Sequence, residues 1–115
     1  MTLAEIAKEL DLEILTETRD LSQRTPTAGY ASDMLSRVMA HAPRDGALWV
    51  TLQSHANIVA VGAVLGLSAI IITEGERPDP ETIAKASEMG IPLLATAKPT
   101  FHVVGNLWRL GLREG

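Results

Sequence analysis

The sequence contains no cysteine, few aromatic residues and no run of basic residues. The absence of cysteine excludes a disulfide framework, thiolate catalysis, iron–sulfur clusters and cysteine-based zinc sites. Aromatic residues make up 3% of the chain, so we expect an aliphatic core in which Trp49, Trp108, Tyr30 and Phe101 are the few large rings. A formal net charge of −4 without a basic patch argues against a nucleic-acid polymer as partner.

A long enough apolar run for a membrane span is also missing. No charged side chain occurs between Asp45 and Glu74, but the strictly apolar part of this window, 58–72, is shorter than the roughly 20 residues that a span requires. The segment 1–20 carries several acids and no apolar stretch, so we expect no secretory signal. We therefore expect a cytoplasmic protein that does not insert into a membrane.

The length of 115 residues predicts a single domain over 1–115. Thr2 and Glu5 form a capping-box pattern that begins a short helix to about Leu10. Further along, 12–14 and 28–32 have the composition of strands, and Ser32 or Asp33 can cap a brief helix through Met39.

From residue 47 onward, strand and helix patterns alternate with short connections. We expect strands at 47–52, 68–73 and 91–95, and helices at 54–65, 79–89 and 100–110. Asp79 and Pro80 are typical of a helix start and Gly90 of a helix end. The expected fold class is α/β: a small three-layer domain with a parallel βαβαβα core over about residues 47–111, plus additional N-terminal strands and a short helix.

Polar side chains follow the expected strands, where an open parallel sheet binds its ligands. The candidate ligand-binding residues are Gln53, Ser54, His55, Asn57, Thr73 and Thr96, together with Ser32 and Asp33. Ser54 and the backbone amides of His55 and Ala56 would form an oxyanion cradle, which suits a small anionic or nucleotide-like metabolite. The alternative is that Ser54 caps a helix and Asn57 lies on its surface.

The sequence contains no complete catalytic or cofactor motif. A P-loop and a Gly-x-Gly-x-x-Gly fingerprint are both absent, which removes the main support for a kinase or a dinucleotide-dependent dehydrogenase. His55 could act as a general base, but no partner lies at a triad spacing. The histidines His41, His55 and His102 are too scattered for a metal site. We expect no cofactor and no metal.

Two features point to packing surfaces. Gly62 and Gly66 lie four residues apart and clear one helix face, either for tight packing on the sheet or for a subunit contact. Near the carboxyl terminus, Trp108 and Leu112 are candidates for an exposed apolar patch.

Several segments together resemble stand-alone DRTGG-domain proteins. These are Thr27-Ala28-Gly29-Tyr30, the stretch from Trp49 to Val61 with its Gln-x-His-x-Asn motif, and Ile70-Ile71-Ile72-Thr73. Domains of this family occur as accessory modules in phosphotransacetylases and CBS-domain pyrophosphatases, and their fold is similar to the amino-terminal domain of HPr kinase. The resemblance implies sensing of a phosphorylated or nucleotide metabolite, domain pairing, and a homodimer.

The leading hypothesis is a non-catalytic regulatory module that binds a small anionic or nucleotide-like metabolite at the strand ends and acts as a homodimer. A second hypothesis is a purely structural dimerisation or docking module for a metabolic enzyme. A third is a small enzyme that uses His55 and Asp33 as acid and base.

Overall fold

The computed structural model describes residues 1–115 and contains one five-stranded sheet, with the strand order β1-β5-β4-β3-β2. The strands are β1 (Glu13–Ile14), β2 (Ala28–Ala31), β3 (Ala47–Thr51), β4 (Ala69–Ile72) and β5 (Leu93–Ala95). Strands β2 to β5 pair in parallel, whereas β1 runs antiparallel to β5 at one edge. The predicted parallel core and the added N-terminal strands are confirmed, with both N-terminal strands at sheet edges.

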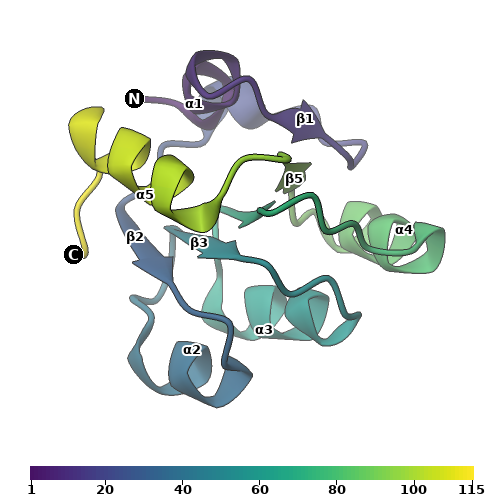
Figure 1. Ribbon diagram of the computed structural model, residues 1–115. Helices are drawn as coiled ribbons and strands as arrows, with labels where there is room; N and C mark the ends of the chain where they lie inside the picture. Colours follow the sequence, from purple (N-terminus) through teal and green to yellow (C-terminus); the bar gives the residue numbers. More distant parts are fainter.

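Helices cover both faces of this sheet. They are α1 (Leu3–Glu9), α2 (Leu35–His41), α3 (Asn57–Leu65), α4 (Pro80–Met89) and α5 (Thr100–Arg109), with a short 3₁₀ helix η1 (Leu21–Gln23). Helices α2, α3 and α4 pack on one face, and α1, η1 and α5 pack on the other (Figure 1). The three-layer α/β architecture predicted from the sequence is confirmed. None of the helices is long and apolar enough to cross a bilayer.

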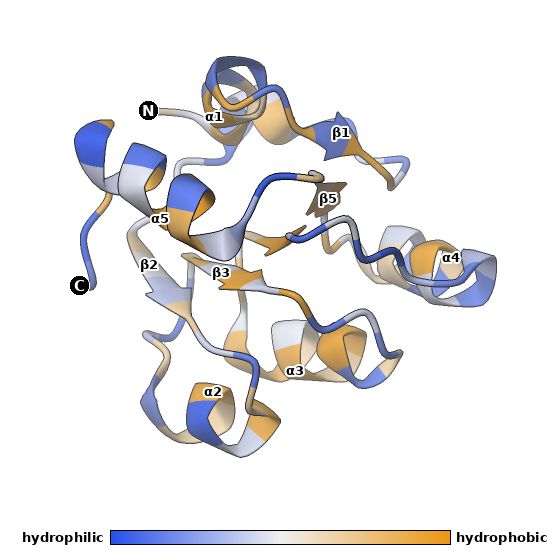
Figure 2. Cartoon of the chain, in the orientation of Figure 1, coloured by the Kyte–Doolittle hydropathy of each residue, from blue (hydrophilic) through white to orange (hydrophobic).

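The core is aliphatic, as expected, and its strands are buried on both faces. Every residue of β3 and β4 is buried, and hydrophobic residues colour much of β3 and the inner turns of α3 orange in Figure 2. The prediction for the large rings holds for Trp49, which is fully buried, and is wrong for Phe101, which is 91% exposed. Because α5 buries Val103 and Leu107 against the sheet, Phe101 and Trp108 fall on its outer side.

Local capping signals predicted some helix ends and missed others. The capping box of Thr2 and Glu5 and the Asp79 cap of α4 are both present. Helix α3, by contrast, begins at Asn57 rather than Ser54, with Ala56 at its cap position and no capping side chain. The alternative interpretation, in which Ser54 caps this helix, is therefore wrong.

The path of the chain determines where a ligand crevice can form. The parallel strands β2 to β5 follow one another in space in the same order as in the sequence, and their connecting helices all lie on one face. In doubly wound sheets, the crevice opens where the strand order reverses, and no such reversal occurs here. After β5, the chain instead crosses the end of the sheet and returns on the other face as α5 (Figure 1).

Candidate functional site

The predicted site residues all follow the parallel strands, at the edge of the sheet where these strands end, here called the carboxyl edge. Ser32 and Asp33 follow β2, the segment from Gln53 to Asn57 follows β3, Thr73 follows β4, and Thr96 follows β5. The structure therefore distributes them along one edge over four neighbouring strands. With strands about 4.8 Å apart, they form a row and do not surround a single point.

The ends of β2 and β3 are joined by a hydrogen-bonded frame around Asp33. One carboxylate oxygen of Asp33 accepts bonds from the Thr51 hydroxyl and from the Leu52 amide, both at 2.8 Å. The Gln53 side chain donates to the Asp33 carbonyl at 3.0 Å. The prediction that Asp33 caps the following helix is wrong, because its carboxylate is engaged by β3. Ser32 accepts a bond from the Met34 amide at 3.2 Å, just before α2.

The segment that leads into α3 presents unpaired donors. The backbone amides of Ser54, His55 and Ala56 have no partner within the chain, and neither does the Ser54 hydroxyl. The His55 ring accepts a bond from the Asn57 amide through Nδ1 at 3.2 Å, which leaves Nε2 free of protein partners. Three consecutive amides before a helix resemble the arrangement that binds anions.

Thr73 is fully buried and bonded within the protein. Its hydroxyl pairs with the Thr100 hydroxyl at 2.6 Å and contacts the Thr51 carbonyl at 3.4 Å. The β5–α5 connection covers it, since the Glu74 amide donates to the Lys98 carbonyl at 2.9 Å. In this conformation Thr73 stabilises the carboxyl edge from the protein interior, where a ligand cannot contact it.

Glu74 is a contributor to this edge that the sequence reasoning missed. Its carboxylate accepts a bond from the Thr100 amide at 2.7 Å, so a residue of the β4–α4 loop caps the first turn of α5. Glu74 has a φ of 64°, in the left-handed region that is costly for a residue other than glycine. A sequence separation of 26 residues gives no local signal for this contact.

Thr96 belongs to a separate part of the edge, beside β1. It lines two shallow hollows of about 230 and 270 Å³, and its hydroxyl accepts a bond from the Lys98 amide at 3.1 Å. An exposed ion pair between Arg77 and Glu13, at 2.9 Å, borders the first hollow. Hydrogen bonds from the Arg77 guanidinium lower the pKa of Glu13.

The acid–base pair of the enzyme hypothesis is not assembled. No hydrogen bond or ion pair joins His55 to Asp33. Hydrogen bonds from Thr82 are the main cause of the lowered pKa of Asp79 at the start of α4, and His55 makes a smaller electrostatic contribution to it. No group of three or more His, Asp or Glu side chains could hold a metal ion.

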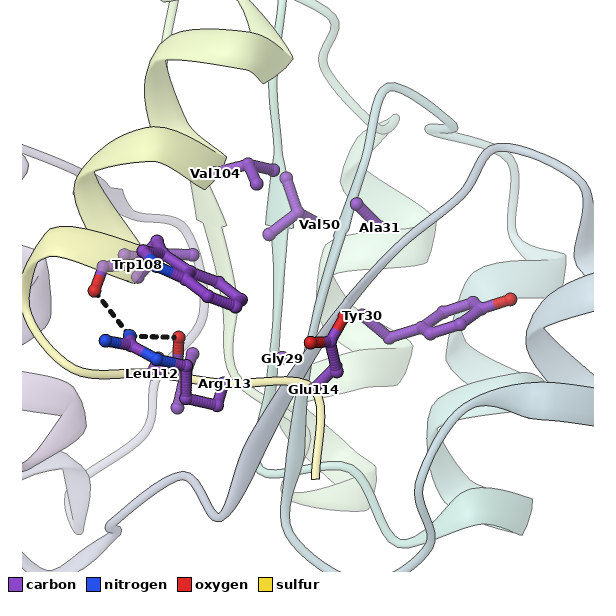
Figure 3. Close-up of a pocket in the computed structure, with 10 residues that line it drawn as sticks. Gly29, Tyr30, Ala31, Val50, Val104, Trp108, Leu112, Arg113 and Glu114 are labelled. Carbon is purple, nitrogen blue, oxygen red and sulfur yellow. Dashed lines mark hydrogen bonds between the residues drawn. The ribbon is translucent and has the colours of Figure 1, made fainter.

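An apolar hollow lies between α5 and β2, and its lining reaches Ala31, the last residue of β2 (Figure 3). This hollow, here called the α5 groove, measures about 290 Å³ and has Gly29, Ala31 and Val50 as its floor. Its lining also includes Val104, Leu107, Trp108, Leu112 and Arg113. Tyr30 points to the opposite side of the sheet (Figure 3). The predicted exposed patch at Trp108 and Leu112 forms part of this groove.

The helix glycines singled out in the sequence are both used inside the chain. A Cβ on Gly62 would lie 3.3 Å from Ile70 and Ile91, so this glycine seats α3 tightly against the core. Gly66 ends α3 with a φ of 65°, and a Cβ there would meet Asp45 at 2.9 Å. The Gly62–Gly66 pair therefore serves internal packing and helix termination.

Both the fold and the family of the chain have counterparts among known proteins. Among solved structures, the chain is similar to the CBS and DRTGG domains of the regulatory region of a Clostridium perfringens pyrophosphatase, which was solved in complex with its activator, diadenosine tetraphosphate. The TM-score is 0.70 at 22% sequence identity, over 90% of this chain and 44% of the other. The chain thus spans less than half of that protein, and the likeness shows a shared fold.

No curated protein matches the sequence. The DRTGG domain model matches residues 5–110, which is nearly the whole chain and agrees with the resemblance seen in its sequence. The chain therefore belongs to the DRTGG domain family.

Proposed function

We infer that this chain is a non-catalytic regulatory module that senses a small anionic or nucleotide-like metabolite and acts as a homodimer. The observation that carries the sensing role is the row of unpaired amides of Ser54, His55 and Ala56 at the start of α3. These amides, the Ser54 hydroxyl and Nε2 of His55 are donors without a partner in an exposed segment, which suits phosphate oxygens.

The frame around Asp33 gives this segment a defined shape. Thr51, Leu52 and Gln53 are each bonded to Asp33, so the chain enters the Ser54–Ala56 segment from an anchored point. Preorganised donors bind more tightly because less conformational freedom is lost on binding. Asn57, at the first position of α3, has a free side-chain amide beside them. The buried Thr73 supports this edge, and Thr96 would contact only a ligand that extends toward β5.

Membership of the DRTGG family supports the regulatory role, since the structural relative is part of an enzyme's regulatory region crystallised with a nucleotide activator. On this proposal the partner is a metabolic enzyme in the cytoplasm, whose activity follows the state of the module.

The test is a thermal-shift titration of the full chain with inorganic phosphate, AMP, ATP, acetyl phosphate and diadenosine tetraphosphate. A ligand that binds the native state raises the apparent stability by about 2.7 kcal/mol at 100 times its dissociation constant. We expect at least one of these phosphate compounds to raise the melting temperature by several degrees.

Two variants locate the site. Ala56→Pro removes one amide donor at a residue whose φ of −54° already suits proline. His55→Asn removes the imidazole but keeps an acceptor for the Asn57 amide. Both should reduce the shift, whereas His41→Ala, an exposed histidine at the end of α2, should leave it unchanged. A shift that survives both site variants would place binding elsewhere, and no shift with any compound would reject the sensing role.

A further inference from the structure

Helix α5 has a second apolar face, which is largely exposed apart from the Arg113 guanidinium that lies over Trp108. Its inner face is formed by Val103 and Leu107, which are buried. Phe101 and Trp108 lie on the outer face, one 91% and the other 49% exposed. Val104 lies between them, so these residues share one helix face by their spacing of three and four. We call Phe101, Val104, Gly105 and Trp108 the α5 face.

Gly105 lies midway along the α5 face, and nothing within the chain requires a glycine at this position. A Cβ added to it would meet no atom within 4 Å, and its φ is not in the left-handed region. Glycine in a helix interior is less favourable than alanine because it loses more backbone freedom. A glycine on an exposed helix face does, however, allow another helix to approach closely.

The composition of this face is that of a protein contact. Between Thr100 and Trp108, the helix contains no Lys, Arg, Asp or Glu, and Arg113 stacks over the Trp108 ring at 4.2 Å. Aromatic residues and arginine are enriched at the energetic centres of interfaces, whereas lysine and acidic residues are depleted there.

The same surface carries both a projection and a recess. Phe101 projects at one end of the α5 face, and the α5 groove lies along its other end, beside Trp108 and Leu112 (Figure 3). If two copies of α5 cross antiparallel at Gly105, Phe101 of one copy comes opposite position 109 of the other. That position lies between Trp108 and Leu112 in the sequence, which both line the groove, so each copy would place its projection beside the recess of the other, as a two-fold interface requires.

Two further observations favour the same arrangement. One is the position of opposite charges at the two ends of α5, and the other is the state of the free edge of the sheet at β2. Glu74 lies at the start of α5, bonded to the Thr100 amide, and Arg109 ends the helix. Antiparallel crossing brings Arg109 of one copy toward Glu74 of the other. Pairing through the free sheet edge is obstructed, because the Arg113 carbonyl already accepts a bond from the Gly29 amide of β2 at 2.7 Å.

We propose that the α5 face is the homodimer interface, with α5 of two copies crossing antiparallel at Gly105 and Phe101 of each copy seated in the α5 groove of the other. This inference rests on the homodimer of the proposed function and specifies which surface forms it. It does not depend on the ligand site at the start of α3, which is built from other residues.

The first test measures the association of the ligand-free full chain by sedimentation equilibrium. The wild-type protein should dimerise at micromolar concentration, and Phe101→Glu should weaken dimerisation by more than about tenfold, as expected for a buried aromatic anchor. Val64→Glu replaces an apolar residue of α3 that is 69% exposed and should leave dimerisation unchanged. A monomeric wild-type protein, or a Phe101→Glu variant that dimerises as well as the wild type, would overturn the proposal.

The second test uses the absence of cysteine from the chain. In a two-fold interface centred on residue 105, single cysteines from Gly105→Cys should lie close enough to form an intermolecular disulfide, which needs Cα atoms about 4.4–6.8 Å apart. Under mild oxidation this variant should cross-link and Val64→Cys should not. Equal cross-linking of both variants would show random collision and reject the crossing point.

The Gly105→Ala variant distinguishes an effect of the added methyl on dimerisation from its effect on helix stability. The added methyl should stabilise the monomer, because alanine favours the helix, and should weaken dimerisation by keeping the two helices apart. A gain in stability without any loss of dimerisation would exclude close approach at Gly105. The thermal shift of the Phe101→Glu variant with the phosphate compounds is read separately, so that loss of the dimer and loss of the ligand site are distinguished.

Discussion

The carboxylate of Asp33 accepts a hydrogen bond from the buried hydroxyl of Thr51 at 2.8 Å, which ties the end of β2 to the end of β3. The same carboxylate oxygen accepts the Leu52 amide. These bonds set the course of the chain just before the Ser54–Ala56 amides. The shape of the candidate site therefore depends on a residue that belongs to a neighbouring strand.

The first prediction concerns this contact. Asp33→Ala leaves the Thr51 hydroxyl and the Leu52 amide without their acceptor, and we expect a loss of about 1.5–3 kcal/mol in the free energy of unfolding, as for hydrogen bonds to a charged group. Asp33→Asn retains an acceptor oxygen and should lose less than half as much. Urea unfolding of the three proteins measures the difference. Equal losses for Ala and Asn would show that the carboxylate charge matters and that the acceptor geometry does not.

The sequence predicted well those elements whose ends are determined by neighbouring residues. Helix α4 begins and ends as expected because Asp79, Pro80 and Gly90 act locally. The start of α3 was misplaced because the His55 ring takes the Asn57 amide, so that the Ser54 hydroxyl is left without a cap contact. Periodicity alone could not determine which side of α5 meets the sheet, and Phe101 was therefore wrongly expected in the core.

The parts of the site that the sequence missed depend on contacts between distant residues. Glu74 caps α5 across 26 residues, and Asp33 reaches Thr51 across 18. The burial of Thr73 follows from the path of the β5–α5 connection, which no local pattern encodes. The sequence did predict that Asp33 and Thr73 follow strands, because that follows from the alternation of strands and helices.

Arg24 carries the second prediction, because it joins three segments that are distant in sequence. Its guanidinium donates to the carbonyls of Ser68 at 3.1 Å and Gly90 at 2.8 Å, and it pairs with Asp20 at 2.9 Å. Arg24→Met retains much of the aliphatic packing but leaves both carbonyls without this donor, so we expect a loss of about 2 kcal/mol in urea unfolding.

Arg44→Met is the matched control for Arg24, since Arg44 is exposed and makes no side-chain hydrogen bond. Its free energy of unfolding should change by less than about 0.5 kcal/mol. Comparable losses in the two variants would show that the guanidinium contacts of Arg24 contribute nothing specific.

The third prediction concerns acid stability through Asp79. Hydrogen bonds from Thr82 lower the pKa of Asp79 in the folded state, with a smaller contribution from the charge of His55. A carboxyl group with a lowered folded-state pKa stabilises the protein fully above its unfolded-state pKa, near 3.9, and this contribution disappears as the pH falls through the folded-state pKa. Asp79→Ala should therefore be less stable than the wild type at neutral pH, and the two should converge as the solution is acidified below about pH 4.

Thermal unfolding of both proteins across this pH range checks the Asp79 prediction, with Glu88→Ala in the same helix as the control. The Glu88→Ala variant should follow the wild-type profile in parallel. A constant gap between Asp79→Ala and the wild type down to the lowest pH would show that the cap acts without its charge.

The final prediction links the carboxyl edge to α5. Thr73 and Glu74 hold the first turn of α5 through the Thr100 hydroxyl and the Thr100 amide, so the segment that begins the proposed dimer interface is bonded to the edge beside the proposed ligand site. Thr73→Val removes one of these bonds at nearly constant volume, and Glu74→Gln retains an acceptor while removing the charge. Either change should raise the rate of amide hydrogen exchange in the first turn of α5, because local opening there loses fewer contacts.

The amides of α4 provide the internal control, and uniform acceleration in both helices would indicate global destabilisation. Faster exchange confined to α5 would identify Thr73 and Glu74 as the contacts through which an event at the strand ends can reach the face that carries Phe101 and Trp108.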